Sequence, residues 1–302
     1  MERKLIKPVF VPVVKKEDHI LPFLPLERKK AIEMPSAPYS LTSHFPKKHL
    51  GQNFLIDHNV RQRIIEACAL KKTDTILEIG PGKGTLTELI APQVQRVIAV
   101  ETDEGLSQGL REKFARTNVT IVHQDILDYP FDELKGTAKA VGNLPYNIAT
   151  AIIEKFLLHR HLFSTFYLMI QWEVGLRLTA KPDTKDYGSL SCFVQYYVQP
   201  KILFKIKNTA FKPVPKVQSC FMELKMLSQP LLQAVDEALL FKITRLAFQQ
   251  RRKTLPNTLS SLMDKNQLSE VMERLKISPK ARAEDLSLRD FILLSNLLAG
   301  II

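Results

Sequence analysis

Between residues 57 and 158 the chain alternates short apolar runs with amphipathic segments, and this alternation constrains the fold more than any other feature. The strand-like runs are DTILEIG, RVIAVE, VTIVHQD and AKAVGN. The segments with helical or turn character are DHNVRQRIIEACAL, GTLTELIAP, EGLSQGLREKFA and ATAIIEKFLL. Strands that alternate with helices form a parallel sheet with helices on both faces. The sequence therefore predicts an α/β, Rossmann-like core.

The rest of the chain has a different character on each side of this core. Residues 1–45 are rich in proline and contain no glycine, which predicts a flexible arm. After the core, FYLMIQ, LSCFVQYYV, KILFKI and SCFMELKM read as strands that extend the sheet in a partly antiparallel way. From about residue 231 the pattern is helical. We therefore expect an arm at 1–45, a core at 46–228 and a small all-α domain at 229–302.

Composition narrows the class of protein and its partners. The chain has 302 residues, of which 45% are hydrophobic, and this length suggests about two domains. Its net charge of +12 favours a polyanionic partner, because neutralising phosphates releases condensed counterions. Nucleic acid is the leading partner class. A basic but otherwise ordinary surface is the alternative, since the charges are dispersed along the chain.

Several classes of protein and site are disfavoured. The longest apolar run, FILLSNLLAGII, is interrupted by Ser295 and Asn296, so no membrane span is expected. Prolines and charges near the start argue against a secretory leader. Cys68, Cys192 and Cys220 lack the spacing of a disulfide framework or a zinc site. We expect a cytoplasmic protein with buried, reduced cysteines and no metal.

A glycine-rich turn follows the first predicted strand. The sequence LEIGPGKGT places Gly80, Gly82 and Gly84 between this strand and a helix, where bare backbone can approach a ligand. The dinucleotide fingerprint would need a glycine at position 85, which is Thr85 here. The turn therefore predicts a nucleotide-type site rather than a pyrophosphate site.

Acidic residues follow the next two strands. Glu101 ends the second strand, where a carboxylate can accept hydrogen bonds from both hydroxyls of a ribose. Asp125 ends the third, where it can accept a bond from an exocyclic amine of adenine while Ile126 packs on the ring. Either acid alone would be an ordinary solvated strand end. Together with the glycine turn, they predict an adenosine-containing cofactor.

The fourth strand delivers the sequence GNLPYN to the same edge, because parallel strands share one crevice at their carboxyl ends. The amine of adenine is a poor nucleophile, since its lone pair is delocalised into the ring. The side-chain carbonyl of Asn143 and the backbone carbonyl of Leu144 can accept its two protons and orient it. Pro145 stiffens the loop, and Tyr146 can stack on the base. The alternative is a simple turn, for which glycine, asparagine and proline are common.

With these motifs assembled, the chain resembles the bacterial 16S ribosomal RNA adenine dimethyltransferases of the KsgA type over residues 46–302. The resemblance rests on HLGQNFLID, EIGPGKGTLT, VIAVETD, QDIL, GNLPYNIAT, YGSLSCFVQYY, AFKPVPKVQSC and FQQRRKTLPNTL. It implies an S-adenosyl-L-methionine-dependent methyltransferase that dimethylates N6 of two adjacent adenines near the 3′ end of 16S rRNA. The implied substrate is the immature 30S subunit, with a role in ribosome biogenesis, and we expect a monomer.

The resemblance also implies site residues. Cofactor contacts are implied for Asn53, Leu55, Gly80, Glu101, Asp125 and Asn143, and Gly82 and Ile126 join them from the reading of the residues above. Phe211 is implied to face Tyr146 across the target base, although by itself it would read as a loop anchor. Arg251, Arg252 and Lys253 are implied to dock on RNA, whereas the simpler reading is a solvated helix face.

Two positions depart from the family pattern, and two rival functions remain open. Trp172 stands where lysine is more usual, which removes an RNA contact or adds a stacking face, and Asp183 stands where glycine is frequent. The first rival is a macrolide-resistance-type 23S rRNA adenine methyltransferase. The second is a non-catalytic rRNA-binding assembly factor on the same fold, which the intact motifs argue against.

Overall fold

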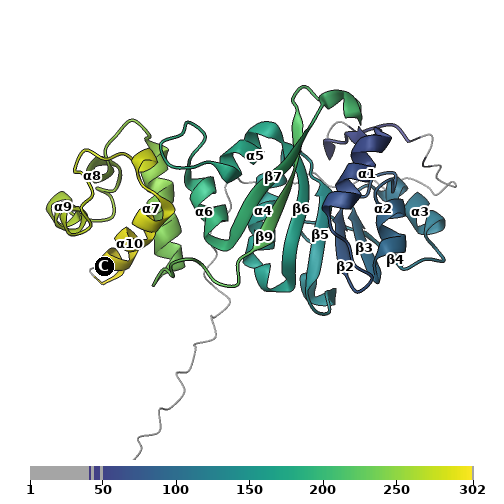
Figure 1. Ribbon diagram of the computed structural model, residues 1–302, viewed down its shortest axis with the longest axis horizontal. Coiled ribbons are helices and arrows are strands. Elements are labelled where there is room, and N and C mark those ends of the chain that lie inside the picture. The colour runs from purple at the N-terminus through teal and green to yellow at the C-terminus, as the bar shows by residue number, and fades with distance from the viewer. Residues whose placement is uncertain (1–40, 42–43, 48–49, 301–302) are drawn as a thin grey trace, which may run out of the picture. The chain divides into compact units, whose positions relative to one another are not determined.

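The computed structural model describes Leu41, residues 44–47 and residues 50–300. The predicted arm at 1–45 therefore lies almost entirely outside the described residues. The regular part begins with β1 (Phe54–Leu55) and α1 (His58–Ala67), which the Asp57 side chain caps by accepting a hydrogen bond from the Val60 N–H. From there strands and helices alternate as predicted (Figure 1).

A seven-stranded sheet forms the centre, in the order β4-β3-β2-β5-β6-β9-β7. Its strands are β2 (Thr75–Ile79), β3 (Arg96–Glu101), β4 (Val119–His123), β5 (Ala138–Asn143), β6 (Phe163–Gln171), β7 (Val198–Ile206) and β9 (Ser219–Met226). The five strands from β4 to β6 are parallel, and β9 runs antiparallel to both β6 and β7. The predicted parallel core with a partly antiparallel extension is confirmed. A separate two-stranded sheet pairs β1 with β8 (Phe211–Lys212).

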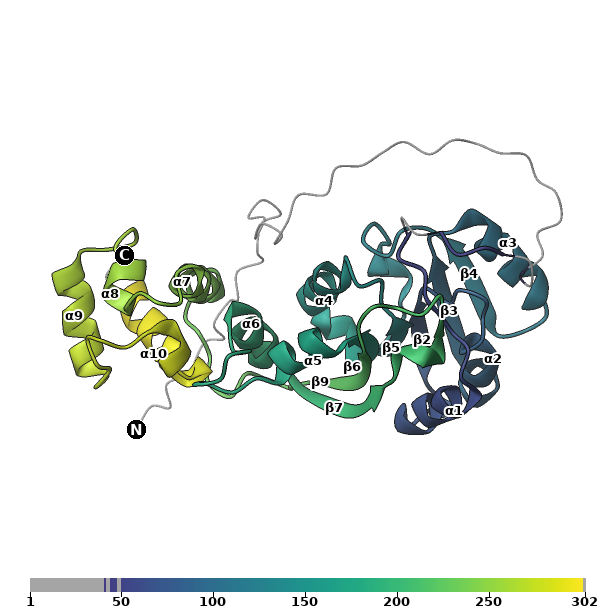
Figure 2. The same cartoon turned by 90° about the horizontal axis from the view of Figure 1, so that it is seen from above.

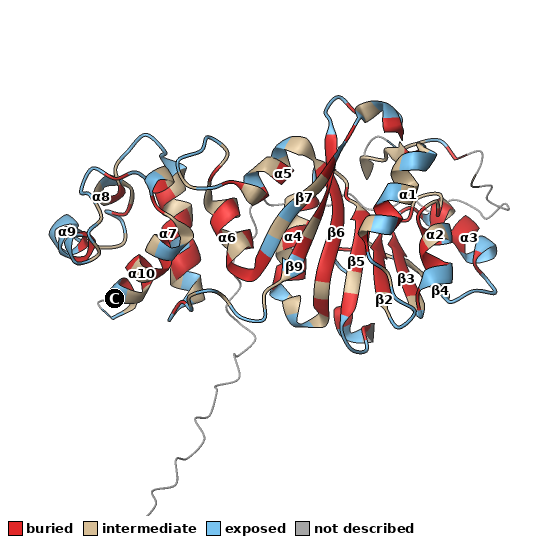
Figure 3. Cartoon of the chain, viewed as in Figure 1, coloured by how far each residue is buried: buried red, intermediate tan, exposed pale blue. Residues whose placement is uncertain are grey.

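Alternate residues of the central strands enter two buried clusters, one on each face of the sheet. Leu77 and Ile98 belong to one cluster, and their neighbours Ile76 and Val97 belong to the other. Helices α1 and α2 (Thr87–Ile90) contribute to the second cluster, and α4 (Ala149–Leu158) contributes to the first. Figure 3 shows the strands as the most buried part of this region. The core is thus an α/β sandwich, as the alternation predicted.

The remaining helices and 3-10 turns complete the chain. The helices are α3 (Glu104–Lys113), α5 (Trp172–Thr179), α6 (Ser189–Tyr197), α7 (Glu237–Gln249), α8 (Leu255–Thr258), α9 (Lys265–Arg274) and α10 (Leu288–Ala299). The 3-10 turns are η2 (Ala91–Gln93), η3 (Phe131–Glu133), η4 (Arg160–Leu162), η5 (Asn208–Ala210) and η6 (Ala283–Asp285).

Two expectations about secondary structure are wrong. The run LSCFVQYYV is not a strand, because its first eight residues lie in α6. Gly188 precedes this helix, its N–H donates to the Ser191 hydroxyl at 3.0 Å, and the buried side chains recur at helical spacing, ending in Tyr196 and Tyr197. A short, continuously apolar run has no period that separates a buried helix from a buried strand. Residues 231–236 are likewise not helical, since α7 begins only at Glu237, after the cap Asp236.

The C-terminal helices share an apolar core with the rest of the chain. The cluster that contains α4 and β6 continues through α6 into α7 and α10. The Tyr197 hydroxyl also donates to Glu237 Oε2 at 2.6 Å, across the start of α7. The helical character of this region is confirmed, whereas the domain boundary at 228/229 stays a prediction.

The three cysteines are free and buried, as predicted. In the part of the chain that the structure describes, every helix is too short or too polar to cross a bilayer.

Candidate active site at the carboxyl ends of the parallel strands

Three neighbouring parallel strands end at one edge of the sheet, and each delivers a predicted site residue there. Gly80 follows β2, Glu101 is the last residue of β3, and Asn143 is the last residue of β5. The N–H of Gly80 donates to the Val100 carbonyl at 2.9 Å, which joins the glycine turn to the end of β3. The structure thus brings these predicted residues together.

The glycine turn needs glycine at specific places. Gly80, Gly82 and Gly84 all have positive φ, which only glycine adopts readily. At Gly84 a Cβ would lie 2.8 Å from Leu110 and 2.9 Å from Phe114, so the turn packs directly on α3. The turn is therefore fixed against the helix behind it.

Glu101 is buried beside this turn and is held by backbone donors. Its Oε2 accepts from the Gly82 N–H at 2.9 Å, and its Oε1 accepts from the Asp103 N–H at 2.9 Å. Burial raises the pKa of Glu101, and the two N–H donors oppose that rise. The carboxylate is thus fixed at the mouth of the turn, where a ligand diol would meet it.

Glu78 is a second buried acid at this edge, and the sequence analysis passed over it. The residue is 2% exposed, and its Oε2 has no hydrogen-bond partner among the described residues. Burial raises the pKa of Glu78 to about 7. The available signal was a glutamate inside the otherwise apolar strand TILEI, directly before the glycine turn. A polar atom left unpaired there fits a site that a polar ligand completes.

Asp125 and Ile126 lie in the turn after β4, two and three residues beyond its end, slightly later than predicted. Asp125 Oδ1 accepts from the Leu127 N–H at 2.9 Å, and Ile126 is buried. Lys155 of α4 reaches the same turn and donates to the carbonyls of Ile126, Leu127 and Tyr129 at 2.9, 2.9 and 2.7 Å. This lysine fixes the turn that presents Asp125, a role that its place in a helical pattern did not signal.

The orientation of the Asn143 amide is set by one hydrogen bond. Its Nδ2 donates to the Asn53 carbonyl at 2.9 Å. This bond identifies the nitrogen end of the amide, since side-chain amides are assigned from their partners. The Oδ1 end is consequently the end available to accept a proton from a ligand. Leu144 is buried, and its N–H donates to the Met169 carbonyl at 3.0 Å, which fixes the loop to β6.

Tyr146 is half-buried, and its hydroxyl lies 2.6 Å from the Ser219 hydroxyl at the start of β9. Burial raises the pKa of Tyr146, and the bond to Ser219 opposes that rise. Phe211, by contrast, is 1% exposed and pairs with Leu55 between β8 and β1. Its ring belongs to a buried cluster, so the facing of Phe211 and Tyr146 across a base stays a prediction.

The segment before α1 forms a strap across these elements, which we define as residues 44–47 and 50–55. Asn53 receives the Asn143 amide, and Leu55 pairs with Phe211. A Cβ at Gly82 would lie 3.1 Å from the ring of Phe54, so the strap packs directly on the glycine turn. The strap therefore touches the glycine turn, Asn143 and Phe211.

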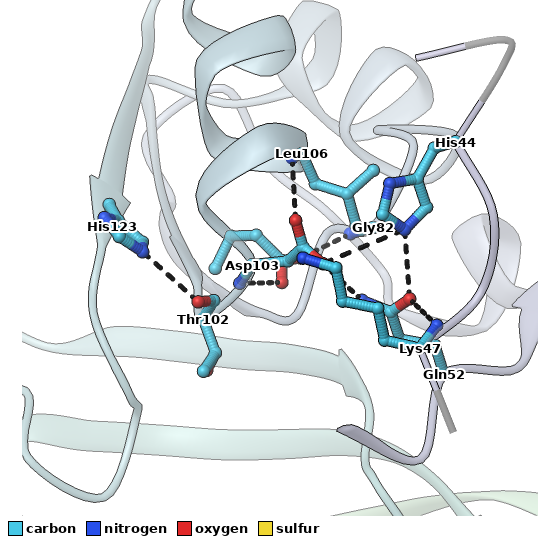
Figure 4. Close-up of polar contacts among 9 residues, drawn as sticks. His44, Lys47, Gln52, Gly82, Thr102, Asp103, Leu106 and His123 are labelled. Atoms are coloured by element: carbon cyan, nitrogen blue, oxygen red, sulfur yellow. Dashed lines mark hydrogen bonds and ion pairs between the residues drawn. The ribbon is translucent and has the colours of Figure 1, made fainter. Parts of the chain in front are cut away.

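Asp103 anchors the strap (Figure 4). Its Oδ2 lies 2.9 Å from Lys47 Nζ and accepts from Gln52 Nε2 at 3.1 Å, while its Oδ1 accepts from the Leu106 N–H at 3.1 Å and caps α3. Gln52 Oε1 in turn accepts from the Lys47 N–H at 2.8 Å. Burial works to raise the pKa of Asp103, but its donors, Lys47 foremost, hold it below the usual value. No sequence pattern indicated that Asp103, two residues after Glu101, would be this anchor.

The predicted RNA-docking residues follow the end of α7. Arg251 is tied within the chain, since its Nη1 donates to the Lys185 carbonyl at 2.7 Å and its Nη2 lies 3.1 Å from Glu284 Oε2. Arg252 and Lys253 are exposed. Their contact with RNA stays a prediction, and Arg251 has a structural role in addition.

Asp183, the second departure from the family pattern, has φ of 62°. This is the left-handed conformation for which glycine is the usual residue. Its N–H donates to the Glu284 carbonyl at 2.9 Å.

Metal-binding groups of three or more histidine, cysteine or acidic residues do not occur among the residues described.

Comparisons with known proteins point in the same direction. Residues 44–300 match the model of the family described as ribosomal RNA adenine dimethylase. The ribosomal RNA small subunit methyltransferase A of Clostridium botulinum is 42% identical over 260 residues, which cover 84% of this chain and 94% of that protein. The protein of the same name from Moorella thermoacetica is 40% identical over 266 residues, covering 84% and 92%.

Two solved structures are also similar. A dimethyladenosine transferase from Plasmodium falciparum gives a TM-score of 0.73 at 24% identity, covering 82% of this chain and 98% of that chain, and shows the fold. The 23S rRNA methyltransferase ErmE gives a TM-score of 0.66 at 26% identity, covering 82% and 100%.

Proposed function

Because the chain belongs to the ribosomal RNA adenine dimethylase family, and is therefore a methyltransferase, we propose that it dimethylates N6 of two adjacent adenines near the 3′ end of 16S rRNA. The proposed methyl donor is S-adenosyl-L-methionine, and the proposed substrate is the immature 30S subunit in the cytoplasm. The small subunit is favoured because relatives named for it are 40–42% identical, against 26% for ErmE.

The residues at the strand ends fit this cofactor. S-adenosyl-L-methionine supplies a methyl group that is already activated by a sulfonium. Glu101 offers carboxylate oxygens to a ribose diol, and the turn of Asp125 and Ile126 offers an acceptor and an apolar surface to an adenine ring. The exposed Gly80 offers bare backbone to the remaining part, and Glu78 Oε2, which has no hydrogen-bond partner among the described residues, offers it a polar atom. The chain then has to bind the cofactor and the adenine, orient them and exclude water.

The observation that carries the proposal is the fixed amide of Asn143. Its nitrogen is bound to the Asn53 carbonyl, so its Oδ1 is the acceptor that an incoming amine meets. We infer that Asn143 Oδ1 and the Leu144 carbonyl accept hydrogen bonds from the N6–H groups and orient the nitrogen as it becomes tetrahedral. Tyr146, held by Ser219, lies in the same loop and supplies a stacking face.

The proposal that the substrate is RNA is supported by the charge of the chain. A net charge of +12 suits a polyanion, and the exposed Arg252 and Lys253 supply cations in the helical region. We expect the protein to act as a monomer, with Phe211 facing Tyr146 across the target base.

The test is to incubate the protein with methyl-labelled cofactor and immature 30S particles, and to map the methylated nucleotides. We expect label on N6 of two adjacent adenines near the 3′ end of 16S rRNA. Label on 23S rRNA in a parallel reaction with 50S particles would instead assign the ErmE-like activity. Particle binding without label would support a non-catalytic assembly factor.

A further inference from the structure

Trp172, the only tryptophan of the chain, is linked to the proposed base-binding loop through a strand pair. Gln171, which ends β6, pairs with Ser219, whose hydroxyl binds Tyr146. The next residue, Trp172, begins α5, and its N–H donates to the Gln218 carbonyl at 2.9 Å. Helix α5 packs on β6, β7 and β9 in this region (Figure 2). The backbone of Trp172 is therefore fixed one residue beyond the strand pair whose Ser219 binds Tyr146.

A cation covers the indole. Lys205 of β7 is exposed, and its Nζ lies 4.4 Å from the centroid of the Trp172 ring. Such a contact is weak at an exposed site, and a phosphate competes for the same ammonium. The ring is partly buried against the large apolar cluster, so it is held rigidly. A phosphate that draws Lys205 away would uncover a fixed aromatic face.

The neighbouring surface is basic and partly apolar. Residues 205–218 contain four lysines, at 205, 207, 212 and 216, and no acidic residue. All four lysines are exposed, and Val214 is 60% exposed between Pro213 and Pro215. The nearest acid in sequence to the indole is the exposed Glu173. Cations that alternate with rigid apolar groups beside an aromatic ring match the chemistry of single-stranded nucleic acid.

We propose that Trp172, Lys205 and the 205–218 segment form a platform that binds the RNA nucleotide next to the target adenine, with the base stacked on Trp172 and its phosphate on Lys205. This proposal rests on the proposed function, since it places the flanking nucleotide of the same substrate. The stack would hold the strand while the target adenine enters the loop of Tyr146.

Because Trp172 is the sole tryptophan, its fluorescence reports this platform directly. The full-length protein is titrated with a single-stranded RNA oligonucleotide of about eight nucleotides that contains two adjacent adenines, a length within the usual site size. We expect saturable quenching of the emission. In Trp172→Leu, affinity measured by anisotropy of the labelled RNA should fall about five- to hundredfold, the range of a base–aromatic stack. Trp172→Phe, which keeps an aromatic face, should retain most of the affinity.

A second variant keeps the test independent of folding at Trp172. Lys205→Gln should weaken binding and lower the salt slope by about 0.7, the value for one phosphate contact on a single strand. The matched control is Lys135→Gln, an exposed lysine before β5 at the opposite end of the parallel strands, which should bind as wild type. Unquenched emission while the labelled RNA still binds would overturn the platform. Quenching by ribosomal proteins that are free of RNA, without quenching by the oligonucleotide, would also overturn the platform.

The two proposals fail in different ways. If mapped 30S methylation is present while Trp172→Leu and Lys205→Gln bind RNA as wild type does, the platform is wrong and the proposed function stands. If RNA quenches Trp172 and the variants lose affinity but no methylated adenine is found, the proposed function is wrong and only the RNA platform remains.

Discussion

At the scale of single residues, the site contains two buried carboxyl groups that differ in their hydrogen-bond donors. Glu78 and Glu101 both lie at the carboxyl ends of the parallel strands, and burial raises the pKa of each. Glu101 has two backbone donors, whereas Glu78 Oε2 has none among the described residues. Ionisation of Glu78 in the folded protein therefore has a cost that no donor at Oε2 offsets among the described residues.

This difference predicts a pH-dependent stability. A carboxyl whose pKa rises from 4.5 to about 7 on folding destabilises the folded state progressively as pH rises through that window. Glu78→Gln cannot ionise at this position. Its unfolding free energy relative to wild type should therefore increase by roughly 3 kcal/mol as the pH rises from 4.5 to 7.5. Urea unfolding across this range measures the gain. The exposed Glu112→Gln is the control, and a Glu78→Gln difference that does not grow with pH would contradict the account.

Residue types at strand ends were predictable, but their partners were not. Gly80, Glu101 and Asn143 could be placed because β-strand periodicity fixes where strands end. Their hydrogen bonds to Val100, Gly82 and Asn53 join positions far apart in sequence, which periodicity does not report. Phe211 shows the same limit, since its motif predicts a role at the base but not its burial against Leu55.

At the scale of elements, the strap couples the start of the core to the site. Lys47 and Gln52 bind Asp103, and the Asp103 N–H binds Glu101, which also binds the glycine turn. A change in the strap is thereby transmitted to the carboxylate proposed to bind ribose. The sequence analysis identified the QNFL part of this strap but not its anchor.

Gln52→Ala tests this coupling without removing the cap of α3. The variant loses the 3.1 Å bond to Asp103 and the acceptor for the Lys47 N–H. Because a hydrogen bond to a charged group contributes about 1.5–3 kcal/mol, affinity for S-adenosyl-L-methionine should fall by about tenfold or more. Calorimetric titration gives the affinity. Gln93→Ala, which removes only an exposed bond to the Leu89 carbonyl, is the control, and equal affinities in the two variants would refute the coupling.

Elements with a clear period were predicted correctly, whereas a continuously apolar run could be assigned wrongly. The parallel strands and α1, α3 and α4 follow their patterns, because each buries one face or one stripe. The run that forms α6 is apolar on nearly all sides, so tertiary burial rather than period decided its state.

At the scale of the whole molecule, charge is the property that connects the chain to its substrate. The excess of 43 lysine and arginine residues over 31 acidic residues is spread along the chain, so no single patch accounts for it. RNA affinity should therefore fall steeply with added salt, since each phosphate contact releases counterions.

The pair Arg252 and Lys253 is suited to this test, because Arg251 also holds Lys185 and Glu284. Replacing both exposed residues by glutamine should weaken binding to 30S particles and lower the salt slope by about one per charge, with unchanged cofactor affinity. Filter binding at several salt concentrations gives the slope. The matched control replaces Arg116 and Lys135, which are exposed before β4 and β5. A similar change in affinity and salt slope in the two double variants would show that the helical region does not dock on RNA.

The central claim is that the fixed amide of Asn143 orients the amine for methyl transfer. Asn143→Ala removes this acceptor, and loss of one preorganised partner should slow transfer by about two to three decades. Asn147→Ala, which removes an exposed amide from the same loop, should react as wild type. The measurement is single-turnover methylation of immature 30S particles at saturating S-adenosyl-L-methionine, with cofactor affinity checked by calorimetry. We predict that Asn143→Ala transfers methyl groups slowly and loses less in cofactor affinity than in rate. Transfer of both methyl groups at the wild-type rate would contradict the central claim.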